Sequence, residues 1–289
     1  MSSPQDFELE QYEGYGWWPL AVIALALVAI FGSRRLAKPL QMVLLPASVA
    51  LIGLMVWQLS CDLSGTKIFP TPEQTAGGMM QLLRDGTLWR YIVASLYRVT
   101  WGFVLAGAIG IPLGLWAGWS SRSFQAINPL IQGLRPISPI AWIPIAILWF
   151  GVGDGAAIFL IFLSSFFPIV VGTMAAVRNI SLVHVRSAQN FGLEGFQLFR
   201  RVVLPASLPQ IITGLRIALG VAWLVVVAAE MIAVNSGLGY LINDARNMGM
   251  RYDLVVAGML VIGAIGIVLD LLIRRLERFD EVRWGYARG

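Results

Sequence analysis

Four ionisable side chains lie inside long apolar stretches of this chain, where a charge is costly unless it is paired or hydrated. They are Arg98, Arg216, Glu230 and Asp270. A guanidinium in such a place can draw an anion inward, and it can equally form a structural ion pair or reach the membrane interface. Arg98 and Glu230 fall in what the topology below makes the outer halves of their stretches, so we predict that they can pair. Asp270 stands four residues before Arg274, a spacing that places both on one helix face.

Neutral donors in the apolar stretches could bind an oxyanion without carrying a full charge. The candidates are Ser138, Trp142, Ser164, Ser165 and Trp223. Each has an ordinary structural use as well, because a serine in a membrane helix can bond the carbonyl four residues earlier and a tryptophan can pack or lie at the interface. Together with Arg98 and Glu230, these residues are the candidate lining of a translocation pathway.

The residues do not support an enzyme active site. His184 is the only histidine and Cys61 the only cysteine, so they cannot assemble a metal site or an internal disulfide. No G-x-x-x-x-G-K-[ST] string, which would cradle nucleotide phosphates, occurs in the sequence. We therefore expect no catalytic residue, no metal and no cofactor bound by this chain.

The composition indicates an integral membrane protein. Of 289 residues, 57% are hydrophobic and 13% charged, and the mean hydropathy is +0.74, a balance that a soluble domain of this size could not keep in solution. The net charge of +5 could suggest nucleic acid, but the basic residues are scattered at the ends of apolar segments instead of gathering on one face. We expect membrane lipid around the chain and no nucleic acid.

Six apolar segments are of a length to cross a bilayer as helices. They are residues 40–59, 89–119, 134–154, 156–177, 211–234 and 254–276. A shorter apolar run at 17–31 follows an acidic tail, and it would either span as an extra helix or lie in the membrane interface. The sequence thus predicts an all-α integral membrane fold with six core spans plus one extra N-terminal helix.

Prolines interrupt the segment 134–154 at Pro136, Pro139 and Pro144. Each proline removes a backbone donor, and broken helices persist at membrane depth only where protein or a water-filled cavity satisfies the freed carbonyls. This segment therefore either lines a pathway or is a kinked packing helix.

Lysine and arginine residues gather on one side of the expected spans. The positive-inside rule then places the N-terminus outside, the C-terminus in the cytoplasm and a polar, glycine-punctuated stretch at 186–205 in the cytoplasm. Within that stretch, apolar residues recur at helical spacing from Leu193 through Phe196, Phe199 and Val203, which predicts a short amphipathic helix. Such a helix is too short to span, so it can lie along the membrane or present aromatic side chains to a partner.

The same stretch resembles the cytoplasmic EAA loop of ABC importer permeases. The matching positions are Ser187, Ala188, Gly192, Leu204 and Pro205. The acidic residue that often opens the motif is Arg186 here, so any ion pair made by that acid must be absent or inverted. In that family the loop forms a coupling helix that docks on the ATPase subunit, which implies that Leu193, Glu194, Phe196 and Phe199 belong to the docking surface as well.

The resemblance covers about residues 87–276, through ASLYRVTWGF, RPISPIAWIP, VAAEMIA and GLGYLI, and points to the nitrate, sulfonate, taurine and bicarbonate branch. It implies a type I ABC importer transmembrane domain that moves a small anion into the cytoplasm by alternating access. It also implies a second copy of the chain, cytoplasmic ABC ATPase subunits that carry the ATP and Mg, and an external substrate-binding protein. The implied location is the bacterial inner membrane.

Four parts of the chain follow from this interpretation. Residues 1–38 form an acidic external tail and the extra helix, 39–86 a first core span and external loop, 87–276 the core permease domain with its coupling loop at 179–205, and 277–289 a cytoplasmic basic tail. External methionines could contact a delivered binding protein or pack on the membrane surface, namely Met79, Met80, Met248 and Met250. Two alternatives remain: an ABC importer of another small solute, and an ATP-independent secondary transporter, although no convincing internal repeat is present.

Overall fold

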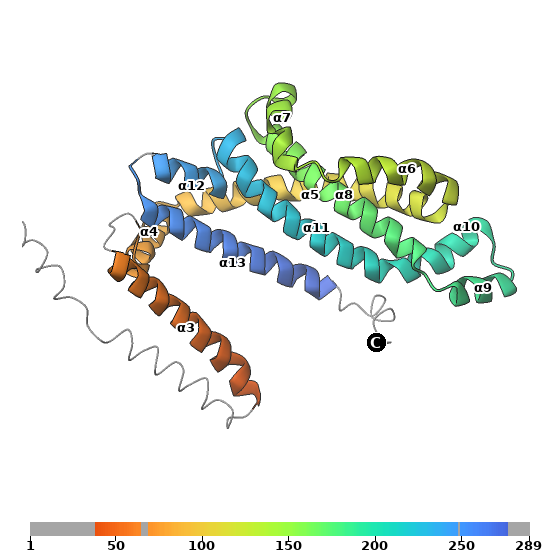
Figure 1. Cartoon of the computed structure of the whole chain (residues 1–289), viewed down its shortest axis with the longest axis horizontal. Coiled ribbons are helices and arrows are strands. Elements are labelled where there is room, and N and C mark those ends of the chain that lie inside the picture. Colours follow the sequence, from red (N-terminus) through yellow and green to blue (C-terminus); the bar gives the residue numbers. More distant parts are fainter. Residues whose placement is uncertain (1–37, 65–68, 248, 277–289) are drawn as a thin grey trace, which may run out of the picture. The chain divides into compact units, whose positions relative to one another are not determined.

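The structure, a computed structural model, describes residues 38–64, 69–247 and 249–276. Every regular element in these ranges is a helix (Figure 1). In chain order they are α3 (Lys38–Ser64), α4 (Pro72–Arg84), α5 (Thr87–Trp119), α6 (Ser121–Leu134), the 3₁₀ helix η2 (Pro139–Trp142), α7 (Ile143–Phe150), α8 (Asp154–Arg178), α9 (Leu182–Asn190), α10 (Gly195–Leu198), the π-helical segment η3 (Phe199–Val203), α11 (Leu204–Ala233), α12 (Leu238–Asn247) and α13 (Tyr252–Leu276). The predicted helix at 17–31, the acidic tail, Met248 and the basic tail at 277–289 lie outside the described residues.

Five helical stretches of the described chain are long and apolar enough to cross a membrane. They are Leu45–Leu63, Thr87–Trp119, Asp154–Arg178, Gly195–Ala233 and Tyr252–Arg275. A sixth span results if Ser121–Leu134 and Pro139–Phe150, which are bent by 83° at their junction, count as one. The all-helical membrane fold is therefore confirmed, and the six core spans depend on this bent pair.

The bent pair differs from the predicted segment 134–154 in where its first helix begins. Helix α6 begins at Ser121, because the Ser120 hydroxyl caps it by accepting a hydrogen bond from the Ser123 N–H at 3.3 Å. The chain then breaks between α6 and Pro139, which lies at the first position of η2, where its missing N–H costs nothing. The prolines break the segment as expected, but an N-cap that sequence reasoning missed adds a whole amphipathic helix before them.

The described chain divides into two compact units. The first comprises α3, α4 up to Gln81, and residues 250–257; the second comprises residues 82–249 and 258–276. Within the first unit, the Trp57 indole donates to the Pro70 carbonyl at 3.1 Å, and a side chain at Gly78 would lie 3.2 Å from the Asp253 main chain. The end of α3, the start of α4 and the start of α13 are thereby held together.

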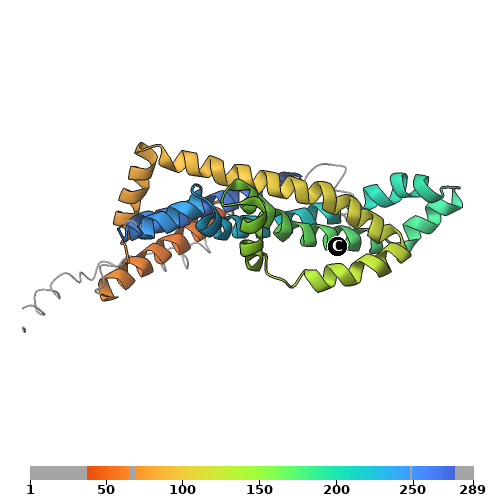
Figure 2. The same ribbon diagram turned by 90° about the horizontal axis from the view of Figure 1, so that it is seen from above.

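Helices α5, α8 and α11 form the core of the second unit, and they run alongside one another in both views (Figures 1 and 2). Helix α5 meets α8 through small residues spaced four apart, namely Gly102, Ala106, Gly110, Gly114 and Gly118. A Cβ atom at Gly114 would lie 2.6 Å from the Thr173 Cβ, closer than real atoms approach. The two backbones are therefore in near contact, as small residues allow in membrane helices.

Candidate functional site

The loop at 179–205 lies at one end of the second unit and consists of α9, a tight turn, α10 and η3 (Figure 1). Helix α9 ends in a Schellman motif, in which the Leu193 N–H bonds the Ala188 carbonyl at 3.1 Å and the Gly192 N–H bonds the Gln189 carbonyl at 2.9 Å. Gly192 occupies the left-handed position of that motif, with φ of 81°. The glycine of the sequence pattern thus has a local cause, because a side chain is disfavoured there.

The helix predicted from Leu193 begins at Gly195 instead, and it continues through η3 into α11 without a break. In η3 the Leu204 N–H bonds the Phe199 carbonyl, five residues earlier, so this turn is wider than an α-helical turn. Leu198 and Val203, also five apart, are therefore buried together. Within the predicted apolar face, Val203 is buried and Phe196 is 73% exposed.

Apolar side chains project from the loop into solvent. Phe191 is 87% exposed, and Leu182, Val183 and Phe196 are exposed with it. Of the other predicted docking residues, Ser187, Glu194 and Pro205 are exposed, Leu193, Phe199 and Leu204 are half-buried and Ala188 is buried. His184 is exposed at the same end. A cluster of exposed aromatic and aliphatic side chains on a short loop is typical of a surface that another protein covers.

At the opposite end of α5, Arg98 is the centre of a buried polar network, and it does pair with Glu230. The Arg98 Nη1 lies 2.7 Å from the Glu230 Oε1, and both side chains are almost fully buried. The Arg98 guanidinium also donates to the carbonyl and hydroxyl of Ser236. Its Nε donates to Asp154 Oδ1 at 2.7 Å. One side chain therefore joins α5 to α8, to α11 and to the turn before α12.

The second oxygen of Glu230 completes the network. It accepts from the Ser95 hydroxyl at 2.8 Å and from the Gly239 N–H at 2.9 Å. Gly237, with φ of 105°, lies so close to this carboxylate that any Cβ there would overlap it. Because the buried polar atoms of the described residues all have partners, the network is fully satisfied.

The neutral pathway candidates do not converge on one place. Ser164 and Ser165 are buried and both donate to the Ile161 carbonyl of their own helix. The Trp223 indole donates to the Ile262 carbonyl of α13 at 3.0 Å. Ser138 is exposed before η2, and Trp142 is half-buried against the core. The hydroxyls of Ser164 and Ser165 and the Trp223 indole N–H are therefore engaged by backbone carbonyls.

A second ion-pair cluster joins the N-terminal half of α11 to the C-terminal half of α13. The Arg216 Nε lies 2.7 Å from Asp270 Oδ1, and the Arg274 Nε lies 2.8 Å from Asp270 Oδ2. The pairing of Asp270 with Arg274 agrees with the prediction from their spacing, while Arg216 is an additional partner. The half-buried carboxylate thus pairs with both guanidiniums.

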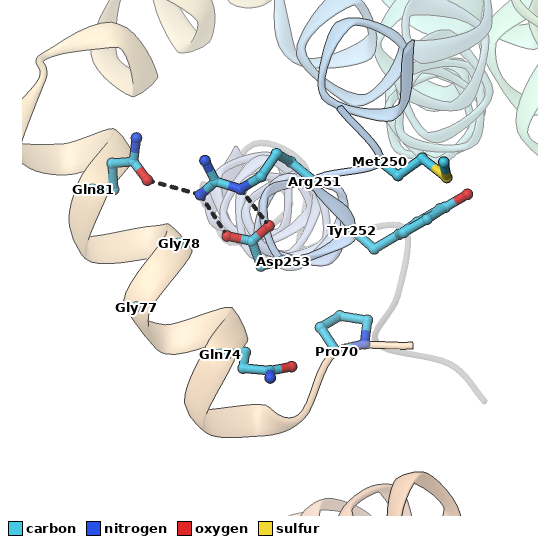
Figure 3. A pocket seen from close by; sticks show the side chains of 9 residues that line it. All are labelled: Pro70, Gln74, Gly77, Gly78, Gln81, Met250, Arg251, Tyr252 and Asp253. Atoms are coloured by element: carbon cyan, nitrogen blue, oxygen red, sulfur yellow. Dashed lines mark hydrogen bonds and ion pairs between the residues drawn. The ribbon is translucent and has the colours of Figure 1, made fainter. Parts of the chain in front are cut away.

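The first unit contains a pocket of about 430 Å³ between α4 and the start of α13 (Figure 3). On one wall, the Arg251 guanidinium forks onto the Asp253 carboxylate and also donates to the Gln81 amide oxygen at 2.8 Å. The hydrogen bond to Asp253 raises the pKa of Arg251 above its ordinary value. Gln74 and Pro70 lie on the opposite side, and Met250 is exposed at the rim.

Sequence reasoning missed three residues that the structure places at these sites. Asp154, the last residue of the expected segment 134–154, and Ser236, between two expected spans, both bind Arg98, and nothing about their positions in the sequence indicates this. Trp119, the last residue of α5, packs edge-to-face on Phe199 with ring centroids 5.5 Å apart. Its place at a helix end gave no signal of that contact, since the partner lies 80 residues further on.

The fold defines a class: a multi-pass, all-helical membrane protein with a loop of exposed apolar side chains between two of its spans. Residues 110–279 match the family described as "Binding-protein-dependent transport system inner membrane component". The chain belongs to this family, and it is an ABC importer permease subunit, a transport component and not an enzyme of its own.

Relatives cover most of the chain. It is 35% identical over 244 residues to the taurine transport system permease protein TauC of Escherichia coli K12, covering 82% of this chain and 88% of that protein. It is 37% identical over 240 residues to the nitrate import permease protein NrtB of Leptolyngbya laminosa, covering 79% of this chain and 85% of that one. A solved structure of the MetNI methionine ABC transporter, facing inward, matches with a TM-score of 0.57 at 19% identity, covering 69% of this chain and 96% of that chain. The last match shows the fold alone.

Proposed function

We propose that this chain carries a small oxyanion or sulfonate across the bacterial inner membrane, in the class of nitrate, alkanesulfonates, taurine and bicarbonate, by alternating access driven by ATP. The observation that carries this proposal is the similarity over about four fifths of the chain to permeases named for taurine and nitrate. The N-terminus lies outside and the C-terminus in the cytoplasm, because this orientation puts most lysine and arginine residues inside.

The loop at 179–205 binds a separate cytoplasmic ATPase subunit, which holds the ATP and Mg. Its exposed Phe191 and Phe196 supply an apolar contact surface, and the Schellman motif at Gly192 fixes the angle between α9 and α10. Because the chain lacks a phosphate-cradling glycine loop of the Walker type, hydrolysis belongs to that partner.

A second copy of this chain completes the pathway. Apolar side chains of the second unit are exposed at α7 and along α13, among them Leu148, Trp149 and Ile267. In a membrane protein such faces meet either lipid or another chain. The candidate lining residues Arg98, Ser138, Trp142, Ser164, Ser165, Trp223 and Glu230 act within this dimer, either at the pathway or, for the buried ion pair, in support of it.

An external substrate-binding protein docks over the pocket of the first unit (Figure 3). The pocket offers amide groups at Gln74 and Gln81 and a guanidinium edge at Arg251, with Met80 and Met250 exposed nearby. Polar groups in the pocket and flexible thioethers beside it suit contact with a protein surface that binds reversibly.

The test is ATP hydrolysis by the reconstituted complex of this chain, its ATPase and its binding protein. The complex receives nitrate, taurine, an alkanesulfonate or bicarbonate, one at a time, and uptake is followed in proteoliposomes. We expect one of these anions to stimulate hydrolysis and to accumulate inside the proteoliposomes. Accumulation without ATP would favour a secondary transporter, and stimulation by a neutral or cationic solute alone would refute the substrate class.

A further inference from the structure

A row of three aromatic rings runs from the exposed surface of the loop to the end of α5. Phe196, which is exposed, stacks on Phe199 with ring centroids 6.3 Å apart and an angle of 25° between the planes. Phe199 in turn meets Trp119 edge-to-face, at 5.5 Å and 66°. Both geometries are favourable arrangements for aromatic pairs. A side chain that would touch a partner is thus connected, through one other ring, to a core helix.

The middle ring stands at a joint in the main chain. The carbonyl of Phe199 accepts the hydrogen bond that opens the wide turn of η3, from the Leu204 N–H. Short π-helical segments inside longer helices are frequent at functional sites, because the extra residue can be gained or lost by a small shift of hydrogen bonds. Phe199 therefore lies where the orientation of α10 relative to α11 is set.

The last ring, that of Trp119, belongs to the end of α5, which is packed tightly against α8. Gly118, the residue before Trp119, is packed so closely on α8 that a Cβ there would lie 2.8 Å from the Val177 Cβ and 3.0 Å from the Met174 carbonyl oxygen. Ala117 is fully buried in the same contact. A push on the Trp119 ring therefore acts on α5 and α8 together.

We propose that Trp119 is a positioning residue for energy coupling: it receives the displacement of the loop through Phe199 and passes it to the α5–α8 pair. The main chain also joins the loop to α8 and α11, and Ala188, Leu198 and Val203 of the loop are buried. This proposal rests on the proposed function, because it requires that the loop binds the ATPase. It assigns a role to a residue outside the loop itself.

The experiment compares Trp119→Leu, Phe199→Leu and the double variant in the complex reconstituted with its ATPase and binding protein. The measured quantity is solute taken up per ATP hydrolysed, with co-purification of the ATPase and the melting temperature as separate readouts. In Trp119→Leu we expect the ATPase to remain bound and uptake per ATP to fall by roughly two- to tenfold, the factor that corresponds to the energy of one aromatic pair. Phe199→Leu should lower uptake per ATP to the same extent, and because Phe199 is also a predicted docking residue, its binding to the ATPase is measured separately. The double variant should lose no more than either single one, and Trp119→Phe should recover most of the ratio.

Trp116→Leu is the matched control, since Trp116 is an exposed tryptophan on the same helix that makes no ring contact among the described residues. It should keep the wild-type ratio, because an interfacial tryptophan alone is not expected to set coupling. If Trp119→Leu fails to assemble, Phe199→Leu removes the same contact from the other side.

Three results would overturn the inference. A wild-type ratio of uptake to ATP hydrolysis in Trp119→Leu or in Phe199→Leu shows that the contact between Trp119 and Phe199 has no part in coupling. A loss that Trp119→Phe does not repair, or that Trp116→Leu reproduces, shows a general structural role. If the wild-type complex takes up no solute with ATP, the proposed function is refuted. The proposed role of Trp119 is then refuted as well, before any variant is compared.

Discussion

Replacement of Glu230 by glutamine tests the buried network around Arg98 in the N-terminal half of α5. The carboxylate accepts three hydrogen bonds, from Arg98, Ser95 and Gly239, at 2.7 to 2.9 Å. A glutamine has one oxygen, so its NH₂ must face either the guanidinium or the pair formed by Ser95 and Gly239, donor against donor. It also leaves the buried Arg98 with only Asp154 as a counter-charge.

Loss of one partner of a buried ion pair costs about 3–5 kcal/mol. With about 2–4 °C of melting temperature per kcal/mol for a chain of this size, Glu230→Gln should lower the melting temperature by about 6–20 °C. Asp154→Asn should cost far less, about 0–1 kcal/mol, because the Asp154 side chain is 56% exposed and shares one bond with Arg98. The measurement is thermal unfolding of the purified permease in detergent.

The control and a double variant separate the pair from the single side chains. Glu73→Gln, at an exposed glutamate in the first turn of α4, should stay within about 1 kcal/mol of wild type. Arg98→Gln combined with Glu230→Gln should be less destabilised than the sum of the two single variants, because neither charge is then left alone. The reasoning is refuted if Glu230→Gln melts like wild type, or if Asp154→Asn costs as much.

Three further expectations concern the helix contact, the loop and the pocket. Gly114→Val should destabilise the permease by about 1–3 kcal/mol or more through overlap with α8, whereas Gly107→Val, where nothing lies within 4 Å, should not; thermal unfolding distinguishes them. Gly192→Ala should cost about 1–2 kcal/mol at its φ of 81° and lower the affinity for the ATPase in pull-down titrations. Arg251→Gln should weaken binding of the external protein to the permease in proteoliposomes, and Arg246→Gln, outside the pocket lining, should not.

The membrane fold could be predicted because its signals are local. Apolar length and terminal basic residues mark α8 and α13 nearly to the residue, since a lipid environment leaves few alternatives to a helix. The start of α6 was missed because its moderately polar sequence carries no span signal, only a serine cap. The wide turn of η3 could not be foreseen either, since periodicity analysis assumes 3.6 residues per turn throughout.

The site residues could likewise be predicted where the signal is local in the sequence, and not where it depends on the tertiary structure. Arg98 and Glu230 could be paired from sequence, because two opposite buried charges at similar depth leave little choice. Asp154 and Ser236 could not, since a residue in a turn is free to face solvent and only the tertiary structure brings it to a guanidinium. Ser164 and Ser165 are the opposite case. Their residue type suggested that they bind a substrate, but in the structure their hydroxyls donate to a backbone carbonyl of their own helix.

Helix α5 is expected to move as one rigid element over most of its length. From Arg98 to Trp119 the helix runs about 32 Å at 1.5 Å per residue. Along that length Ile161, Ile169, Thr173 and Val177 of α8 pack directly on glycines of α5, namely Gly102, Gly110, Gly114 and Gly118. Helices packed this closely cannot slide past one another without overlap, so they tilt as a pair. At the far end the Arg98 network ties the same pair to α11 and to the turn before α12. On the proposed relay, a displacement of Trp119 would therefore move all these elements together.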